Sequence, residues 1–386
     1  MSELNDISAI TTDGIALREI TTASGHRIGH ATLNATASLN ALNLAMVKRL
    51  QTAFDAWAED PHVVAVVLDG AGEKAFCAGG DVASLAREIR TLRETDPAAV
   101  SPLAAAFFEH EYRLDHRLHT FPKPIVCWGH GIVMGGGIGL LAGCSHRVVT
   151  PRTRLAMPEV AIGLYPDVAG SWFLPRMPGK SGLFLALTGA SVNAADARFT
   201  GLADFIARNE DEPLLLAALA AAAWQGEPET DGAQLSHLIE ALGTPADLAP
   251  SPVRTHLDLI NATMGHDRLV DIAPRLRALA DHADPWVAGA VQGFVKGSPS
   301  SAAVAYALLQ RTRSMSLAEV LRLEYQVSLG CCVHNDFAEG VRALLIDKDK
   351  QPRWDPPTLE TVSPAHVEAH FVPRHGADAH PLQDLR

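Results

Sequence analysis

The sequence lacks an excess of positive charge. It carries 32 lysine and arginine residues against 44 aspartate and glutamate residues in 386, a formal net charge of −12. No overall basic field exists to attract nucleic acid or an anionic membrane surface. We therefore expect neither as a partner, and an anionic ligand would have to be recognised locally.

Cysteine and long apolar runs are also scarce. The five cysteines, an odd number, form no C-x-x-C pair, which fits a reducing compartment better than a disulfide framework. No apolar run reaches about 18 residues without charge or turn residues, and the first six residues include the acidic Glu3 and Asp6 where a signal peptide would have basic residues. These absences predict a cytoplasmic protein that is neither secreted nor membrane-spanning.

Several well-known catalytic motifs are incomplete. A phosphate-binding loop ending at Gly179-Lys180-Ser181 would need glycine at Leu174, and a dinucleotide fingerprint at residues 135–137 would need glycine at Leu140. His110-Glu111 would need histidine at Leu114 to form a zinc-protease helix. No serine lies in a G-x-S-x-G elbow. We therefore expect neither phosphoryl transfer nor a metal site of these types.

What the chain does contain is an alternation of strands and helices. Hydrophobic residues make up 47% of it, enough for a full core. Their spacing predicts strands at 29–33, 63–68 and 125–128 and a helix at 42–59, which indicates an α/β architecture. After about residue 206 the pattern becomes mainly helical, with helices predicted at 214–224 and 316–329. The last thirty or so residues are proline-rich and are predicted to be extended.

Two glycine-bearing loops follow predicted strands, at residues 74–82 and 130–141. Each has a structural explanation, since the first could be an ordinary strand-to-helix turn with Asp81 as N-cap of a helix predicted at 83–93, and the second could need glycine for close packing. The alternative is that their backbone N–H groups stabilise a developing negative charge, as acyl transfer requires. The order of the two loops favours this second interpretation.

Carboxylates supply the other half of the predicted site. Glu159 and Asp167 lie eight residues apart on an apolar, turn-rich segment about twenty residues after the second glycine loop. Glu111 lies on a predicted amphipathic helix at 107–118. Each could be purely structural: Glu159 as a buried carboxylate, Asp167 as a turn residue after Pro166, and Glu111 on a solvated face. The functional interpretation is acid, base or nucleophilic work.

Together, residues 76–81 (FCAGGD) and 131–137 (GIVMGGG) resemble the crotonase, or enoyl-CoA hydratase/isomerase, superfamily. The resemblance implies an α/β, crotonase-like spiral of β-β-α units over residues 13–205, followed by a mainly helical C-terminal region over 206–386 with an extended tail. It also implies an acyl-CoA substrate and an oxyanion hole formed by the N–H groups of Gly80 and Gly136.

Within that superfamily the carboxylates resemble those of the 3-hydroxyisobutyryl-CoA hydrolase branch. Gly139 stands where hydratases usually carry one of two glutamates, while Asp167 stands where they commonly have glycine. Residues 324–325, 336–343 and 346–349 extend the likeness towards the C-terminus. The resemblance implies that Glu159 and Asp167 are catalytic and that Glu111, Gly136, Glu159 and Asp167 bind the substrate.

The same resemblance implies hydrolysis of a short 3-hydroxyacyl-CoA in valine degradation, with no metal and no cofactor beyond the coenzyme A of the substrate. Homo-oligomers are common in the superfamily. Two alternatives stay open, namely an enoyl-CoA hydratase or isomerase and a non-catalytic acyl-CoA-binding protein. The sequence leaves the acyl group open, and Glu159 is either a nucleophile or a general base.

Overall fold

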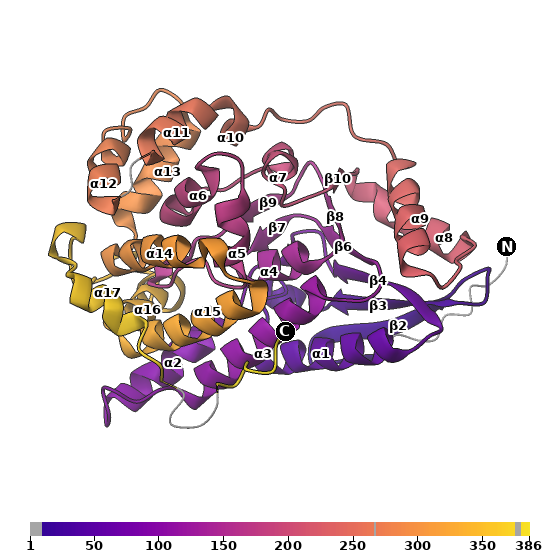
Figure 1. Ribbon diagram of the computed structural model, residues 1–386, viewed down its shortest axis with the longest axis horizontal. Coiled ribbons are helices and arrows are strands. Elements are labelled where there is room, and N and C mark those ends of the chain that lie inside the picture. Colours follow the sequence, from indigo (N-terminus) through magenta and orange to yellow (C-terminus); the bar gives the residue numbers. More distant parts are fainter. Residues whose placement is uncertain (1–9, 266–267, 375–379) are drawn as a thin grey trace. The chain divides into compact units, whose positions relative to one another are not determined.

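The computed structural model describes residues 10–265, 268–374 and 380–386 (Figure 1). The chain divides into two compact units, each made of three separate stretches. Unit 1 comprises Met1–Gly80, Leu114–Leu155 and Val192–Ser251, and unit 2 comprises Asp81–Arg113, Ala156–Ser191 and Pro252–Arg386. Because the units interleave along the chain, they do not coincide with the predicted division after residue 205.

Unit 1 is built on a seven-stranded sheet with the order β1-β2-β3-β4-β6-β8-β10. The first three strands pair antiparallel, and from β3 onward the neighbours are parallel. The strands predicted at 29–33, 63–68 and 125–128 are confirmed as β3, β4 and β6. The seven strands are β1 (Ile10–Thr12), β2 (Ile15–Thr21), β3 (Arg27–Leu33), β4 (Val63–Gly70), β6 (Ile125–Gly129), β8 (His146–Val149) and β10 (Phe205–Ile206).

Helices cover both faces of this sheet. Successive strand residues point to opposite faces, and Ile28 belongs to a buried cluster that includes Leu219 of α8 and Leu235 of α9. On the other face α1 packs so closely that a Cβ at Gly29 would lie 2.5 Å from the Trp57 ring. The helices that begin and end within unit 1 are α1 (Leu44–Glu59), α4 (Gly136–Gly143), α7 (Ala194–Thr200), α8 (Glu212–Ala221) and α9 (Pro228–Glu240).

A second, three-stranded sheet has the order β5-β7-β9. Its strands are β5 (Ala75–Cys77), β7 (Ile132–Met134) and β9 (Arg154–Ala156). β5 and β7 run parallel, and each lies within one of the two glycine-bearing segments, directly before Gly79-Gly80 in the first and Gly135-Gly136-Gly137 in the second. This small sheet therefore places the two loops at one edge.

Unit 2 is helical in its described residues. The predicted helices at 83–93 and 316–329 are confirmed as α2 and α15, and Asp81 is the N-cap of α2, accepting a hydrogen bond from the Ser84 N–H. Helix α3 (Pro102–His119) begins in unit 2 and ends in unit 1. The helices that lie wholly within unit 2 are α2 (Val82–Arg93), α5 (Gly170–Phe173), α6 (Ser181–Thr188), α10 (Pro252–Thr255), α11 (Leu257–Met264), α12 (Leu269–Arg277), α13 (Pro285–Lys296), α14 (Pro299–Arg311), α15 (Leu317–Val333), α16 (Asn335–Val341) and α17 (Pro364–His370).

The C-terminal tail is only partly extended. It contains α17, which begins at Pro364 after the N-cap Ser363 and packs against α14 and α15. A short 3₁₀ turn, Leu359–Thr361, precedes it. A proline-rich sequence is compatible with a helix here because proline fits at the first helical position.

Candidate functional site

The two glycine loops lie side by side in unit 1. At Gly79 the backbone has φ +102°, and a Cβ on this residue would lie 3.2 Å from the Met134 backbone oxygen and 3.7 Å from the Gly136 nitrogen. A Cβ on Gly137 would lie 2.5 Å from the Cys77 backbone oxygen. Close packing therefore accounts for Gly137, and positive φ together with close approach accounts for Gly79.

The N–H groups of Gly80 and Gly136 have no such structural use. Gly136 is the first residue of α4, whose N-cap, Gly135, offers no side chain. In the described part of the chain, neither the Gly80 N–H nor the Gly136 N–H donates a hydrogen bond. The dipole of a helix adds positive potential at its first N–H groups. Among the described residues both donors therefore lack an acceptor, which is compatible with the oxyanion prediction.

Glu159 opens the 3₁₀ helix Glu159–Ile162 in unit 2. The residue is only 5% exposed, and within the described ranges its Oε2 has no hydrogen-bond partner. Burial, and after it the charge of Asp167, raises the pKa of Glu159 well above the ordinary 4.5. A buried carboxylate with a raised pKa and an oxygen without a partner has the properties of a base or nucleophile.

The helix that carries Glu159 is held tightly by later parts of the chain. It ends at Gly163, with φ +77°, where a Cβ would lie 2.1 Å from the backbone oxygen of Asp336 in α16. At its other side, the Ser298 N–H donates to the Val160 backbone oxygen over 2.8 Å. The C-terminal segment around Asp336 therefore forms part of the support of Glu159.

Asp167 lies in the turn that follows this helix and is 4% exposed. The Tyr112 hydroxyl donates to its Oδ2 over 2.6 Å. Burial raises the pKa of Asp167 to about 6, and the hydrogen bond from Tyr112 acts in the opposite direction. Asp167 is therefore mostly ionised at neutral pH and titrates close to it.

Glu111 precedes Tyr112 on α3 and is 4% exposed, so the solvated-face alternative is wrong for this residue. The structure thus brings Glu111, Glu159 and Asp167 into unit 2, while Gly80 and Gly136 belong to unit 1. The roles of these five residues remain predictions.

Four polar residues around Asp167 were not predicted as site residues: Tyr112, Tyr165, Glu324 and Ser328. Ser328 Oγ lies 2.6 Å from the Tyr112 hydroxyl oxygen and 2.8 Å from that of Tyr165, and Tyr165 donates to the Glu324 backbone oxygen over 2.7 Å. Tyr112 had a sequence signal in its position beside Glu111. Ser328 had none, because it lies 216 residues away from Tyr112 along the chain.

Among the described residues, no group of three or more histidine, cysteine, aspartate or glutamate side chains is arranged to hold a metal ion. Nor does any described helix have the length and apolar character needed to cross a membrane.

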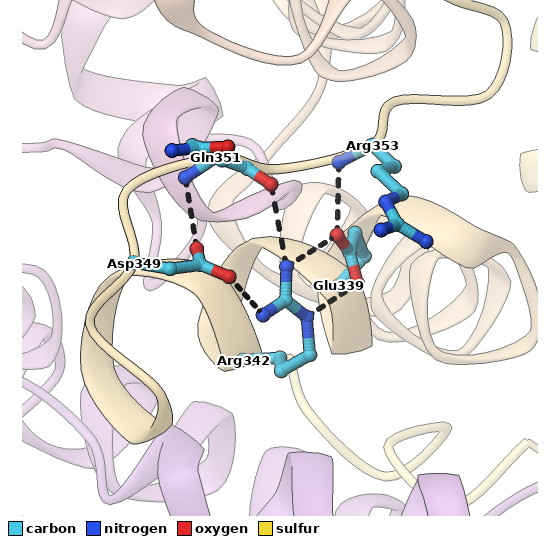
Figure 2. Close-up of a pocket in the computed structure, with 5 residues that line it drawn as sticks. All are labelled: Glu339, Arg342, Asp349, Gln351 and Arg353. Atoms are coloured by element: carbon cyan, nitrogen blue, oxygen red, sulfur yellow. Dashed lines mark hydrogen bonds and ion pairs between the residues drawn. The ribbon is translucent and has the colours of Figure 1, made fainter.

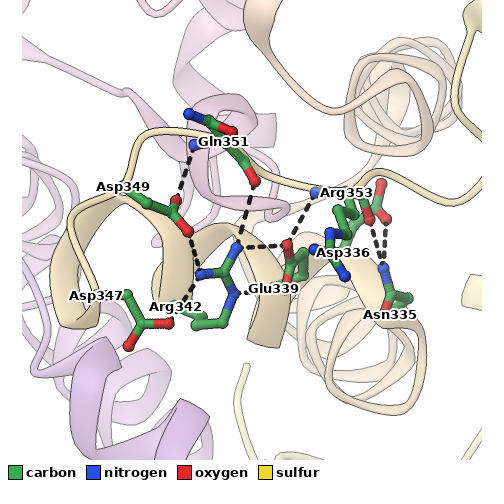
Figure 3. Close-up of polar contacts among 8 residues, drawn as sticks. All are labelled: Asn335, Asp336, Glu339, Arg342, Asp347, Asp349, Gln351 and Arg353. Carbon is green, nitrogen blue, oxygen red and sulfur yellow. Dashed lines mark hydrogen bonds and ion pairs between the residues drawn. The ribbon is translucent and has the colours of Figure 1, made fainter.

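A separate polar pocket of about 350 Å³ lies near the end of α16 (Figure 2). At its centre Arg342 donates from all five guanidinium N–H groups, twice to Glu339 and once each to Asp347, Asp349 and the Gln351 backbone oxygen (Figure 3). No donor of Arg342 is left for a ligand. We therefore interpret this pocket as a structural ion-pair network.

The chain is similar to known proteins over most of its length. The enoyl-CoA hydratase/isomerase family matches residues 28–371. A 3-hydroxyisobutyryl-CoA hydrolase of Xenopus tropicalis mitochondria is 38% identical over 89% of this chain and 86% of its own, and the human protein of that name is 36% identical over the same shares.

Two solved structures are also similar. One, described as an enoyl-CoA hydratase from Rhodobacter sphaeroides 2.4.1, has a TM-score of 0.79 and 36% identity, covering 94% of this chain and 98% of its own. The other, described as a carnitinyl-CoA dehydratase from Mycobacterium thermoresistibile, has a TM-score of 0.80 and 34% identity, covering 95% and 98%. They confirm the predicted crotonase-like α/β fold. The chain belongs to the enoyl-CoA hydratase/isomerase family.

Proposed function

We propose that the protein hydrolyses a short 3-hydroxyacyl-CoA thioester, 3-hydroxyisobutyryl-CoA foremost, to the free hydroxy acid and coenzyme A. The observation that carries the proposal is the buried carboxylate of Glu159, whose Oε2 has no partner in the described structure, in a chain with Gly139 where hydratases usually have a second glutamate. The curated relatives named as hydrolases of this thioester support the choice of substrate.

In the proposed reaction, the thioester carbonyl oxygen accepts hydrogen bonds from the Gly80 and Gly136 N–H groups. As the carbonyl carbon is attacked, its oxygen becomes an oxyanion, and these two donors stabilise it more than they stabilise the ground state. The coenzyme A sulfur then leaves as a thiolate. A thiol has a pKa of about 8.5, so this leaving group needs little protonation at neutral pH.

Glu159 acts on the carbonyl carbon in one of two ways. As a nucleophile it forms a mixed anhydride and expels the thiolate, and water then cleaves the anhydride and restores the carboxylate. As a general base it takes a proton from the water that attacks. Hydroxylamine distinguishes the two, because it would convert an anhydride at Glu159 into a hydroxamate that mass spectrometry of the peptide detects.

Asp167 and Glu111 complete the proposed site. Asp167, held by Tyr112 and mostly ionised at neutral pH, orients Glu159, the water or the substrate hydroxyl. Glu111, buried on α3, accepts the hydrogen bond of that hydroxyl. With Gly136 and Glu159, these residues form the proposed substrate-binding set, and the reaction needs no metal and no cofactor.

The test is the release of free thiol from 3-hydroxyisobutyryl-CoA by the purified protein, with crotonyl-CoA followed in parallel for loss of the conjugated double bond. We expect rapid thiol release and little hydration. Hydration without thiol would instead assign the protein to the hydratases, the alternative that the names of the two similar solved structures favour. Binding of coenzyme A esters without turnover would make it a non-catalytic binding protein.

The acyl group, compartment and assembly are further parts of this proposal. 3-Hydroxypropionyl-CoA lacks one methyl group, a difference worth only about 1–3 kcal/mol in a pocket, so we expect measurable but slower hydrolysis of it. The five cysteines, all among the described residues, are buried and form no disulfide, which is compatible with a reducing compartment. We place the enzyme in the cytoplasm, in valine degradation, as a homo-oligomer without nucleic-acid or membrane partners. Cell fractionation and light scattering test these placements.

A further inference from the structure

The turn that follows Asp167 has an unfavourable backbone. Val168 has φ +49° and Ala169 has φ +67°, so two successive residues with side chains occupy the left-handed region. This region is disfavoured by contact between Cβ and the following carbonyl oxygen, and a β-branched residue such as valine suffers most. Such a conformation persists only where the surroundings hold it.

Glu324 of α15 holds the turn in this conformation. Its Oε2 accepts a hydrogen bond from the Ala169 N–H and its Oε1 one from the Ser171 N–H, each over 2.9 Å. The side chain is completely buried, so water cannot take over either bond. One carboxyl group from a helix more than 150 residues away therefore fixes two alternate N–H groups of the turn.

The same face of α15 also reaches the carboxylate of Asp167. Ser328 lies one helical turn after Glu324, and its hydroxyl oxygen is 2.6 Å from the Tyr112 hydroxyl oxygen. Tyr112 in turn donates to Asp167 over 2.6 Å. Asp167 is thus held through the backbone that follows it and through its own side chain, and both connections lead to α15.

We propose that Glu324 is a positioning residue for the hydrolysis, which holds the turn Asp167–Ser171 in its left-handed form and so sets the place and surroundings of the Asp167 carboxylate. The effect of Glu324 on catalysis rests on the proposed function, whereas its two hydrogen bonds to the turn do not. Glu324 is outside the set of residues proposed to touch the substrate.

The electrostatics agree with this role. Burial, and after it the charge of Asp167, raises the pKa of Glu324 to about 8. The charged and titratable groups that act on Asp167 or feel its charge are Tyr112 on α3, Glu159, Tyr165, and Glu324, Cys331 and Cys332 on α15. Release of the turn would hydrate Asp167 and so lower its pKa.

Amide hydrogen exchange tests the two hydrogen bonds between Glu324 and the turn without any assay of activity. In the wild type we expect the Ala169 and Ser171 amides to be protected. Glu324→Gln retains one acceptor oxygen and should release one of these amides, and Glu324→Ala should release both, each by tenfold or more in exchange rate. Unprotected amides in the wild type would overturn the proposal even if neither variant folds.

Asp231 provides a matched control in unit 1. It is buried and accepts from the N–H groups of Gln225 and Gly226, each over 2.9 Å. Asp231→Asn removes one acceptor from a turn in the same way, so it should release one of the amides of Gln225 and Gly226 and leave those at 169–171 and the hydrolysis unchanged. Loss of hydrolysis in this control equal to that in Glu324→Gln would show a general structural effect and overturn the proposal.

Steady-state kinetics test whether Glu324 affects the hydrolysis by positioning Asp167. A displacement of about 1 Å in a reacting group can cost about 100-fold, and we expect a fall in kcat of that size for Glu324→Ala, a smaller fall for Glu324→Gln, and KM within about threefold. The acidic limb of the kcat/KM profile should move to lower pH. Released amides with unchanged kcat and pH profile would overturn the proposal, whereas a wild type that releases no thiol would overturn only the proposed function.

Discussion

Replacement of Glu159 by glutamine tests the proposed site in both activity and stability. The variant keeps the shape of the side chain, but it can neither attack a carbonyl carbon nor accept a proton from water. The lost group lies in a buried position where Oε2 has no partner among the described residues, so glutamine breaks no hydrogen bond of that oxygen. A loss of activity would therefore report chemistry rather than misfolding.

The expected loss of activity follows from the proposed role. Positioned acid–base catalysis typically contributes about 100-fold to 10⁴-fold, so thiol release by Glu159→Gln should fall by at least about 100-fold at pH 7. The change should lie in kcat, because the substrate's other contacts remain. The measurement is steady-state thiol release from 3-hydroxyisobutyryl-CoA with saturating substrate.

The stability of the same variant relative to the wild type should depend on pH. The folded protein raises the pKa of Glu159, so the stabilising contribution of this group is complete below its ordinary value of 4.5 and is lost as the pH rises towards the raised value. While the group is neutral when folded and ionised when unfolded, the loss is about 1.4 kcal/mol per pH unit. Glutamine does not titrate, so the difference in unfolding free energy between the two proteins should shift in favour of the variant as the pH rises above the ordinary value of 4.5.

Urea unfolding of both proteins at pH 5, 6 and 7 gives this difference directly, since all other titrating groups are shared. Near wild-type thiol release would refute Glu159 as nucleophile or base. A stability difference that stayed constant with pH would refute the raised pKa and with it the burial argument.

Three further outcomes are expected. Tyr112→Phe removes the donor to Asp167, so the pKa of about 6 should rise, and the acidic limb of the pH–rate profile should move to higher pH; an unmoved limb would show that Asp167 does not govern it. Gly163→Ala should lower the unfolding free energy by about 3 kcal/mol or more, since positive φ and a 2.1 Å overlap act together, whereas Gly201→Ala, with positive φ but open space, should cost about 1 kcal/mol; equal losses in urea unfolding would contradict the packing argument. Arg342→Gln should lower the melting temperature, because the carboxylates of Glu339, Asp347 and Asp349 lose their common cation and repel each other. The decrease should be smaller in 1 M salt, which screens this repulsion; a decrease independent of salt would contradict this.

Local pattern was enough to predict several strands and helices and both glycine-bearing loops. Apolar spacing identified β3, β4, β6, α2 and α15, and glycine pairs after strands identified the two loops with Gly80 and Gly136. These signals are local because helix and strand periods and glycine's backbone freedom are properties of neighbouring residues. The resemblance to a family then indicated Glu159, Asp167 and Glu111.

The sequence by itself therefore determined the α/β class, the family and the residue types of the proposed site. Tertiary structure alone decided that Val168 and Ala169 adopt positive φ and that Glu324 and Tyr112 hold the turn and the carboxylate of Asp167. It also decided the raised pKa values of Glu159 and Asp167. The physical reason is that burial and hydrogen bonding between residues up to 155 positions apart arise only when the chain has folded, and no local pattern encodes them.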